Sequence, residues 1–124
     1  MRVRNIKVTV KNLGTALHEF AETFEKASRG EPIVPREEIS FENISVLRKF
    51  LTDRRLELLH VIKQHKPDSI YGLAKLVKRD LKSVNTDLRI LVDLGLVSLY
   101  SVRQERTRMK PRVDFDRLNV EITI

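Results

Sequence analysis

The hydrophobic periodicity of residues 52–97 constrains the fold of this chain more than any other feature. Apolar residues recur there at the spacing of amphipathic helices in three successive segments, which are separated by short polar breaks. The third segment is the clearest, and its apolar stripe consists of Leu81, Val84, Leu88 and Leu91. Asp80 precedes the stripe and is suited to cap a helix, because its short carboxylate can accept from the first free backbone amides. The pattern therefore predicts a helix over residues 80–93.

The two preceding segments predict helices that frame the third. The first begins after Thr52, a suitable cap, and ends at Lys66, because the residue before a proline is pushed out of helical geometry. The second spans about residues 69–77, and Ser69 is its expected cap. Gly72 is unusual within this second helix, since glycine is a weak helix former.

A β-forming and basic stretch follows the three helices. Residues 96–102 are rich in strand formers, and residues 103–112 hold five basic residues and one acidic residue. Pro111 argues against a central strand, so we expect a two-stranded hairpin with a flexible basic tip. Three helices followed by such a hairpin are the order of a winged helix-turn-helix, a fold in which the third helix enters the major groove of DNA.

The third helix and the hairpin carry the candidate DNA contacts. The exposed helix face offers side chains that can bond base edges and phosphates: Lys82, Ser83, Asn85, Thr86 and Arg89. The hairpin, or wing, offers positive charges for the DNA backbone: Arg103, Arg106, Arg108, Lys110 and Arg112. Each set alone is typical of a solvated surface. Their succession in one predicted domain favours contact with DNA.

The first 42 residues predict a separate β-α-β unit. Ile6, Val8 and Val10 alternate with polar residues, which indicates a half-buried strand. A helix over residues 13–28 and a short strand over residues 38–41 follow. Such a unit is too small to bury much surface alone. We therefore expect it to pack on the second domain, on another copy of the chain, or on another protein.

The remaining residues, 43–124, form the predicted winged helix-turn-helix domain. A short helix over residues 43–51 joins it to the first unit. At the other end, residues 119–124 alternate apolar and polar side chains and predict a final strand that can pair with the N-terminal ones. The fold class is therefore α+β, with a winged helix-turn-helix domain and an N-terminal β-α-β extension.

The charge of the chain fits a polyanionic partner. The net charge is +7, and residues 41–124 contain 17 basic and 11 acidic residues. No stretch approaches the roughly 20 apolar residues of a membrane-spanning helix, and no signal peptide is visible. These observations predict double-stranded DNA as the partner, no membrane, and a cytoplasmic location. Because the chain has no cysteine, disulfides and cysteine-ligated metals are excluded.

The sequence gives little support to an enzymatic function. His60 and His65 are five residues apart, so they do not share a helix face at metal-ligand spacing, and His18 is remote from both. The four glycines are too scattered to form a phosphate-binding loop. No nucleophile stands in a recognisable catalytic setting. We therefore expect no enzyme activity, no catalytic residue, no cofactor and no metal.

The stretch SIYGLAKLVKRDLKSVNTDLRILVDLGLV, residues 69–97, resembles the DNA-reading part of MarR-like winged-helix regulators. It is closest to a group of small proteins of archaea and bacteria that are regarded as DNA-binding, some of which resemble antitoxins. Residues 38–41, 51–59 and 111–115 share this resemblance, which implies a transcriptional regulator. The exposed recognition positions of the family fall on Lys82, Ser83, Asn85, Thr86 and Arg89. One departure is Lys78, where such sequences often have glycine. If that position is left-handed, lysine costs about 1 kcal/mol there.

The expected function is therefore that of a sequence-specific transcriptional regulator. Two copies would read a palindromic operator whose half-sites lie about 34–36 Å apart or a multiple of it. Dimerisation is expected through the N-terminal unit and the helix over residues 43–51, and regulation of its own gene is one option. The alternative is a protein-interaction module, such as an antitoxin with a toxin partner. An RNA binder is less favoured, because Tyr71 and Tyr100 are the only tyrosines available for stacking.

Overall fold

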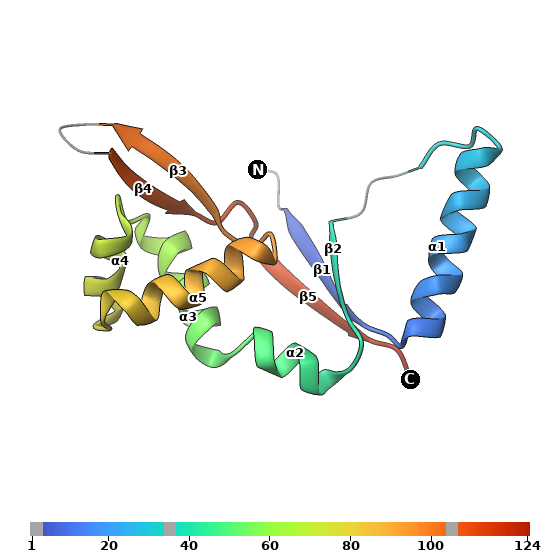
Figure 1. Cartoon of the computed structure of the whole chain (residues 1–124), viewed down its shortest axis with the longest axis horizontal. Coiled ribbons are helices and arrows are strands. Elements are labelled where there is room, and N and C mark those ends of the chain that lie inside the picture. The colour runs from blue at the N-terminus through green and yellow to red at the C-terminus, as the bar shows by residue number, and fades with distance from the viewer. Residues whose placement is uncertain (1–3, 34–36, 104–106) are drawn as a thin grey trace. The chain divides into compact units, whose positions relative to one another are not determined.

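The computed structural model describes residues 4–33, 37–103 and 107–124, which form an α+β fold (Figure 1). The chain divides into two compact units. Unit 1 consists of Met1–Lys49 together with Phe115–Ile124, and unit 2 consists of Phe50–Asp114. These bounds differ from the expected domains 1–42 and 43–124, because the last ten residues pair with the N-terminal strand and residues 43–49 group with unit 1.

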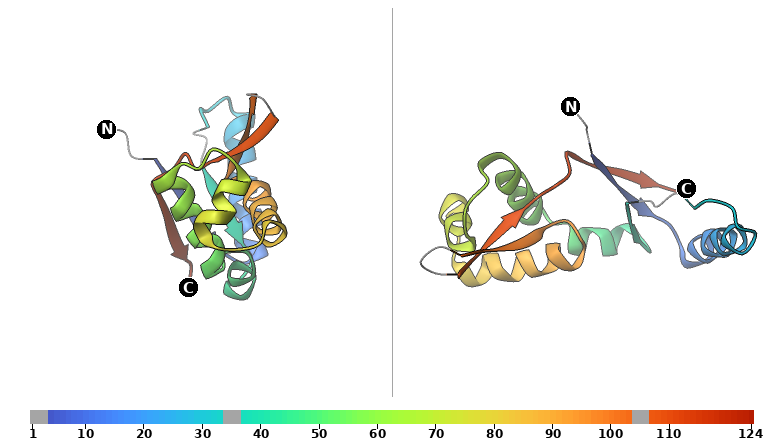
Figure 2. Two further views of the ribbon diagram at one scale, coloured as in Figure 1. Left: turned by 90° about the vertical axis from the view of Figure 1, so that its left-hand side faces the viewer. Right: turned by 90° about the horizontal axis from the view of Figure 1, so that it is seen from above.

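Unit 1 contains a three-stranded parallel sheet (Figures 1 and 2). Its strands, in chain order, are β1 (Asn5–Val10), β2 (Glu38–Phe41) and β5 (Arg117–Ile122). The spatial order is β2-β1-β5, and Val8 stands opposite both Ile39 and Val120. The expectation that the C-terminal strand pairs with the N-terminal one is therefore confirmed.

The two faces of this sheet differ in chemistry. Paired residues of neighbouring strands share a face, and side chains alternate along each strand. One face is apolar and carries Ile6, Val8, Val10, Ile39, Phe41, Leu118, Val120 and Ile122. The other face is polar: Thr9 Oγ1 lies 2.8 Å from Glu38 Oε1 and 2.9 Å from Ser40 Oγ. On the same face, Lys7 Nζ lies 3.0 Å from Glu121 Oε2.

Unit 1 also contains helix α1 (Leu13–Ser28) and most of helix α2 (Ile44–Phe50). Helix α1 starts at Asn12, whose side chain accepts from the backbone amide of Thr15 at 2.9 Å. It ends before Gly30, which has a φ of +74° and so stands in the left-handed region. None of the residues of α1 is buried.

Unit 2 consists of three helices and a two-stranded antiparallel ribbon. The elements are α3 (Asp53–His65), α4 (Ile70–Val77), α5 (Leu81–Asp93), β3 (Ser98–Arg103) and β4 (Thr107–Arg112). Its core contains the fully buried side chains Leu58, Ile62, Leu73, Val84, Leu88, Leu91, Leu96 and Pro111. Pro111 fits into β4 because both strands of a two-stranded ribbon are edge strands, where the missing amide is tolerated.

The helices of unit 2 begin at the caps that the sequence predicts. Thr52, Ser69 and Asp80 each accept a hydrogen bond from a backbone amide of the first turn. The amide of Gly72 donates the bond to Ser69, and a Cβ at Gly72 would lie only 3.2 Å from the Ser69 hydroxyl oxygen. Although glycine is a weak helix former, the absence of a side chain at Gly72 therefore leaves room for the hydroxyl of Ser69 to cap the helix closely.

Two lysines end helices in the left-handed conformation. Lys66 has φ 47° and ψ 57° at the end of α3, and Lys78 has φ 56° and ψ 46° at the end of α4. The backbone at Lys78 thus has the geometry for which glycine is the usual residue. The prediction that lysine is unfavourable at this turn applies, because the side chain crowds the backbone in this region.

Candidate nucleic-acid interface

Helix α5 presents one continuous exposed polar face. Lys82, Asn85, Thr86 and Arg89 are all exposed and occupy positions i, i+3, i+4 and i+7. Val84, Leu88 and Leu91 are buried on the opposite side and anchor the helix in the core of unit 2. The face therefore combines two positive charges, an amide and a hydroxyl on a helix with a fixed rotation about its axis. These groups can donate to phosphates and pair with base edges.

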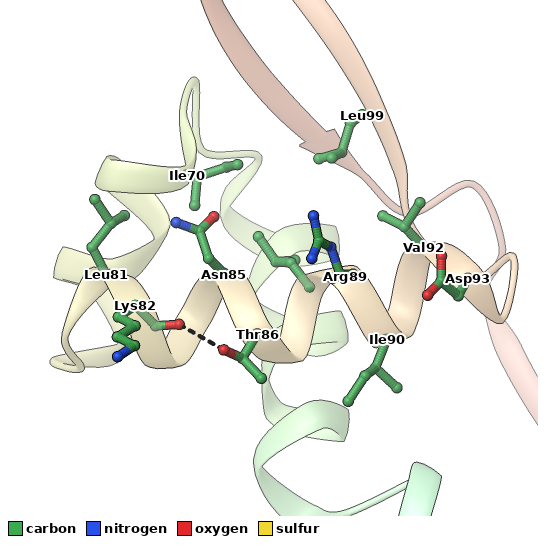
Figure 3. A pocket seen from close by; sticks show the side chains of 11 residues that line it. Ile70, Leu81, Lys82, Asn85, Thr86, Arg89, Ile90, Val92, Asp93 and Leu99 are labelled. Carbon is green, nitrogen blue, oxygen red and sulfur yellow. Dashed lines mark hydrogen bonds between the residues drawn. The ribbon is translucent and has the colours of Figure 1, made fainter.

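A shallow hollow runs beside this face (Figure 3). It is bordered by α5, by Ile70 at the start of α4 and by Leu99 of β3. Asn85 and Arg89 lie on the side of α5 next to Ile70 and Leu99 (Figure 3). The Thr86 hydroxyl donates to the backbone carbonyl of Lys82 at 3.0 Å, so its remaining capacity toward a ligand is that of an acceptor.

Ser83, a predicted contact residue, lies beside the exposed face and not on it. It is half-buried, and its Oγ accepts a hydrogen bond from Arg79 Nη2 at 2.6 Å. Its backbone amide donates to the capping carboxylate of Asp80 at 2.9 Å. Ser83 therefore stabilises the start of α5 and connects it to the preceding turn. The other predicted residues of α5 point outward: Lys82, Asn85, Thr86 and Arg89.

An ion-pair network that we did not predict holds α5 in place. Asp87 receives a hydrogen bond from Arg55 Nε of α3 at 3.0 Å and another from Arg79 Nη2 at 2.7 Å. Arg55 also donates from Nη1 to the carbonyl of Phe50 at 3.0 Å. The side chains of Arg55, Arg79 and Asp87 are only 12–14% exposed. The network therefore joins α3, the α4–α5 turn and α5.

The two guanidinium groups control the charge of Asp87. Burial raises the pKa of this carboxyl, but the hydrogen bonds from Arg79 and Arg55 outweigh burial and hold the pKa below its ordinary value. Asp87 is therefore ionised and neutralised within unit 2. The exposed stripe of α5 keeps the positive charges of Lys82 and Arg89. The other two carboxylates, those of Asp80 and Asp93, stand at the two ends of the helix.

The basic residues of the ribbon are divided between its two faces. The β3–β4 register places Arg108, Lys110 and Arg112 on one face, and Arg103 on the other face with Leu99. Since Leu99 borders the hollow beside α5, Arg103 extends from the ribbon face on the α5 side. Arg106, the remaining predicted wing residue, lies outside the described residues.

The ribbon cations also differ in their bonding. Arg112 Nε lies 2.6 Å from Asp114 Oδ1, and its guanidinium lies 5.6 Å from the centre of the Tyr100 ring. Lys110 Nζ lies 3.7 Å from Asp68 Oδ1. Within the described part of the chain, Arg103 and Arg108 have no ion pair. Alternation along β4 is enough to place Arg108, Lys110 and Arg112 on one face. The placement of Arg103 depends on the register between the strands, and the ion pairs depend on what each face meets.

Neither a metal-binding group of side chains nor a membrane-spanning helix is found among residues 4–33, 37–103 and 107–124. No group of three or more His, Asp or Glu side chains in these ranges is placed to hold a metal ion. None of the described helices is long and apolar enough to cross a membrane.

Comparison with known proteins relates the chain to one family. Residues 50–120, more than half of the chain, match the family model described as HVO_A0114. The matched region contains all of unit 2 and the start of β5, whereas α1 lies outside it. No curated protein and no solved structure matches the chain.

Proposed function

The chain belongs to the HVO_A0114 family, and we propose that this member is a sequence-specific, DNA-binding transcriptional regulator that acts as a homodimer. In this proposal unit 2 is a winged helix-turn-helix. Helices α4 and α5 are its helix-turn-helix, α5 is the recognition helix, and the β3–β4 ribbon is the wing. The order of these elements in unit 2 supports this assignment.

The exposed polar face of α5 is the observation that carries the proposal. Lys82, Asn85, Thr86 and Arg89 form one stripe, and the single carboxylate in the middle of α5, Asp87, is neutralised by Arg55 and Arg79. A helix inserted into a major groove needs such a stripe, because arginine pairs well with guanine and asparagine with adenine. An unpaired carboxylate in the middle of the stripe would instead repel the phosphates, whereas the exposed Asp93 stands at the end of α5.

The wing supplies contacts to the DNA backbone in this proposal. Arg103 is the first candidate, because it shares a ribbon face with Leu99 next to the hollow beside α5. Arg108 is the second, and Lys110 and Arg112 would have to exchange an intramolecular partner for a phosphate. Such contacts position the protein without specifying a base.

The oligomeric part of the proposal concerns the operator. Two copies related by a two-fold axis would place their α5 helices in successive major grooves, at half-sites about 34–36 Å apart or a multiple of it. The operator is then a palindrome. The DNA upstream of the protein's own coding sequence is the first candidate, because small regulators of this kind often control themselves.

The first experiment is a titration of the purified protein, at known oligomeric state, against its own upstream DNA fragment. A scrambled fragment is titrated in parallel, both at two salt concentrations. Saturable binding to the upstream fragment that resists scrambled competitor supports a specific reader. Equal and strongly salt-sensitive binding to both fragments would overturn specificity, because only counterion release would then drive the interaction.

The substitution Arg89→Ala tests the recognition helix itself. If Arg89 contacts a base, its loss should weaken binding to the operator by about 1–3 kcal/mol and leave binding to scrambled DNA nearly unchanged. Arg29→Ala is the matched control, since it also removes one exposed arginine but belongs to unit 1. An equal loss of affinity for operator and scrambled DNA would make Arg89 a phosphate contact.

A further inference from the structure

Helix α1 carries an apolar stripe that the described chain does not cover. Leu13, Leu17, Phe20 and Phe24 follow one another at steps of four, three and four residues, so they lie on one side of the helix. They are exposed by 63, 58, 70 and 66%, respectively, and no residue of α1 is buried. A helix of 16 residues with no buried residue has little to stabilise it in water, since most helical stability in proteins comes from packing.

The sheet of unit 1 does not provide the missing apolar surface. On the sheet side, the hollow between α1 and β2 is lined by Glu38 and Ser40, which belong to the polar face of the sheet, and Phe20 is the one stripe residue that borders it. Lys11 spans this hollow, because its ammonium bonds Glu19 of α1 and lies 3.1 Å from Glu38. Glu19 raises the pKa of Lys11 above its ordinary value and Glu38 adds to this, so the lysine is charged. A charged bridge holds α1 over a polar surface.

The rest of α1 is arranged as in a helix that packs on another helix. The four large residues and Ala27 occupy the a and d positions of a heptad pattern. The flanking e and g positions hold small uncharged residues: Gly14, Ala16, Ala21, Thr23 and Ser28. The titratable residues of the helix stand on its outer positions: His18, Glu19, Glu22, Glu25 and Lys26. Small flanks let a second helix approach closely, and uncharged flanks do not repel an identical copy.

We propose that α1 is the dimerisation helix and pairs in antiparallel orientation with α1 of a second copy of this chain. A two-fold axis near residues 18 and 19 then places Leu13 against Phe24 and Leu17 against Phe20, so every large residue of the stripe meets one from the other copy. Antiparallel helix dipoles attract each other. The first turn of α1, which has no acidic residue, comes near Glu25 of the second copy.

This inference rests on the proposed function in one respect: it names the surface that would build the homodimer reading a palindrome. The interface itself involves no DNA.

The test is sedimentation analysis of the full chain without DNA over the micromolar range. The wild-type protein should be a dimer, and Phe20→Glu should weaken dimerisation at least about 100-fold, because each dimer loses two buried phenylalanines and gains two buried charges. The matched control is Val120→Glu, which places the same charge at a 54% exposed apolar position on the edge strand β5. This control should remain a dimer.

Several results would overturn the inference. A monomeric wild-type chain, a dimer unaffected by Phe20→Glu, or a dimer lost in Val120→Glu would each do so, and the last would assign the interface to β5. A wild-type monomer that instead holds another protein through α1 would do so as well. Failure of the DNA-binding proposal can be distinguished from these results. A protein that remains a dimer through α1 but binds operator and scrambled DNA equally would contradict specific DNA binding and not the α1 interface.

A cysteine pair tests the orientation without relying on a disruptive variant. The natural chain has no cysteine, so Leu17→Cys and Phe20→Cys chains can be made singly and mixed. Antiparallel pairing predicts that the mixed disulfide between positions 17 and 20 forms faster than either homodimeric disulfide. Glu22→Cys on the outer side of α1 is the control and should form no rapid disulfide. Faster 17–17 and 20–20 disulfides would overturn the antiparallel arrangement.

Discussion

Unit 1 and unit 2 bury apolar surface in different ways. In unit 2 each of the helices α3, α4 and α5 contributes buried residues to one core, and its last strand adds the buried Pro111. In unit 1 the buried apolar side chains belong to strands β1 and β2 and to Phe115, which precedes β5, while α1 leaves its stripe in solvent. A unit that covers its own apolar surface can use its exterior for charge. A unit that leaves an apolar helix face exposed offers a surface to a partner, as we propose for α1.

The charges of the two units follow the same division. Residues 50–114 contain 14 basic and 8 acidic residues, whereas the rest of the chain contains 10 and 9. Unit 2 therefore holds nearly all the excess positive charge, which agrees with the DNA-binding role that we propose for it. Unit 1 is nearly neutral, which allows two copies to approach each other without strong repulsion.

The largest expected effect is in the core of unit 2. Leu58→Ala should lower the free energy of unfolding by about 3 kcal/mol, because the side chain is fully buried and its removal leaves a cavity. Phe20→Ala, at a 70% exposed position of α1, should change the free energy of unfolding of unit 2 by less than about 0.5 kcal/mol. Denaturant unfolding followed by a probe within unit 2 measures both. Equal losses would show that the two units are not independent.

The next effect concerns the network that holds α5. Asp87→Asn should cost on the order of 2 kcal/mol of stability, because it leaves two partly buried guanidinium groups without their counter-charge. Asp93→Asn, at an exposed position at the end of the same helix, is the control and should be nearly neutral. A neutral Asp87→Asn would mean that the ion pairs of Arg55 and Arg79 add nothing to the position of α5.

The same carboxyl predicts a pH dependence. Its pKa is lowered in the folded state, so its contribution to stability is present above the unfolded-state pKa of about 4 and is lost as the pH falls through the folded-state value. Unfolding curves measured between pH 7 and pH 3 should therefore show a loss of stability at the acid end. In Asp87→Asn this loss should be smaller. An identical loss in both proteins would assign it to other carboxylates, such as Glu38, whose pKa is also lowered.

A smaller and opposite effect is expected at the α4–α5 turn. Lys78→Gly should stabilise unit 2 by about 1 kcal/mol, because Lys78 has a φ of 56° and glycine adopts this conformation without steric cost. Lys75→Gly in the last turn of α4 is the matched control. It should destabilise the protein by a similar amount, because glycine is a poor helix former. A destabilising Lys78→Gly would show that the lysine side chain itself contributes to the fold.

The smallest effect separates the two faces of the wing. Arg103→Gln should reduce the slope of log binding constant against log salt concentration by about 1, as expected for one lost phosphate contact. Arg112→Gln should reduce it less, because Arg112 is already paired with Asp114 and stacked on Tyr100. Titrations of the operator at several salt concentrations measure both slopes. Equal reductions would contradict the proposal that Arg103 contacts a phosphate while Arg112 keeps its intramolecular partners.

Local patterns were sufficient to predict most of the elements. The helix over residues 13–28, the strand over residues 38–41 and the start of α5 after Asp80 all agree with the structure, because caps and apolar periodicity act within a few residues. We expected lysine to be unfavourable at position 78 if the backbone there were left-handed, and Lys78 does have a positive φ. The domain bounds differed, because the placement of residues 115–124 beside β1 is a long-range pairing.

The candidate site was less predictable than the elements. Ser83 and Asn85 are both polar residues of one helix, and spacing alone does not reveal that Ser83 bonds Arg79 while Asn85 faces outward. One available signal was Asp87, an acidic residue next to Leu88 of the apolar stripe, because a carboxylate close to a core favours a positive partner. The identity of that partner was not available, because Arg55 and Asp87 are 32 residues apart.

The sequence by itself determined the helices of unit 2, their caps, the polar stripe of α5 and the excess of positive charge in residues 50–114. These properties depend on hydrophobic periodicity, on side chains near helix ends and on composition, all of which are local. Only the tertiary structure decided which polar residues of α5 remain exposed, how the wing cations are divided, and that α1 has no cover within the described chain. Those outcomes depend on which distant side chains meet, because burial and pairing are properties of the packed units and not of any short segment.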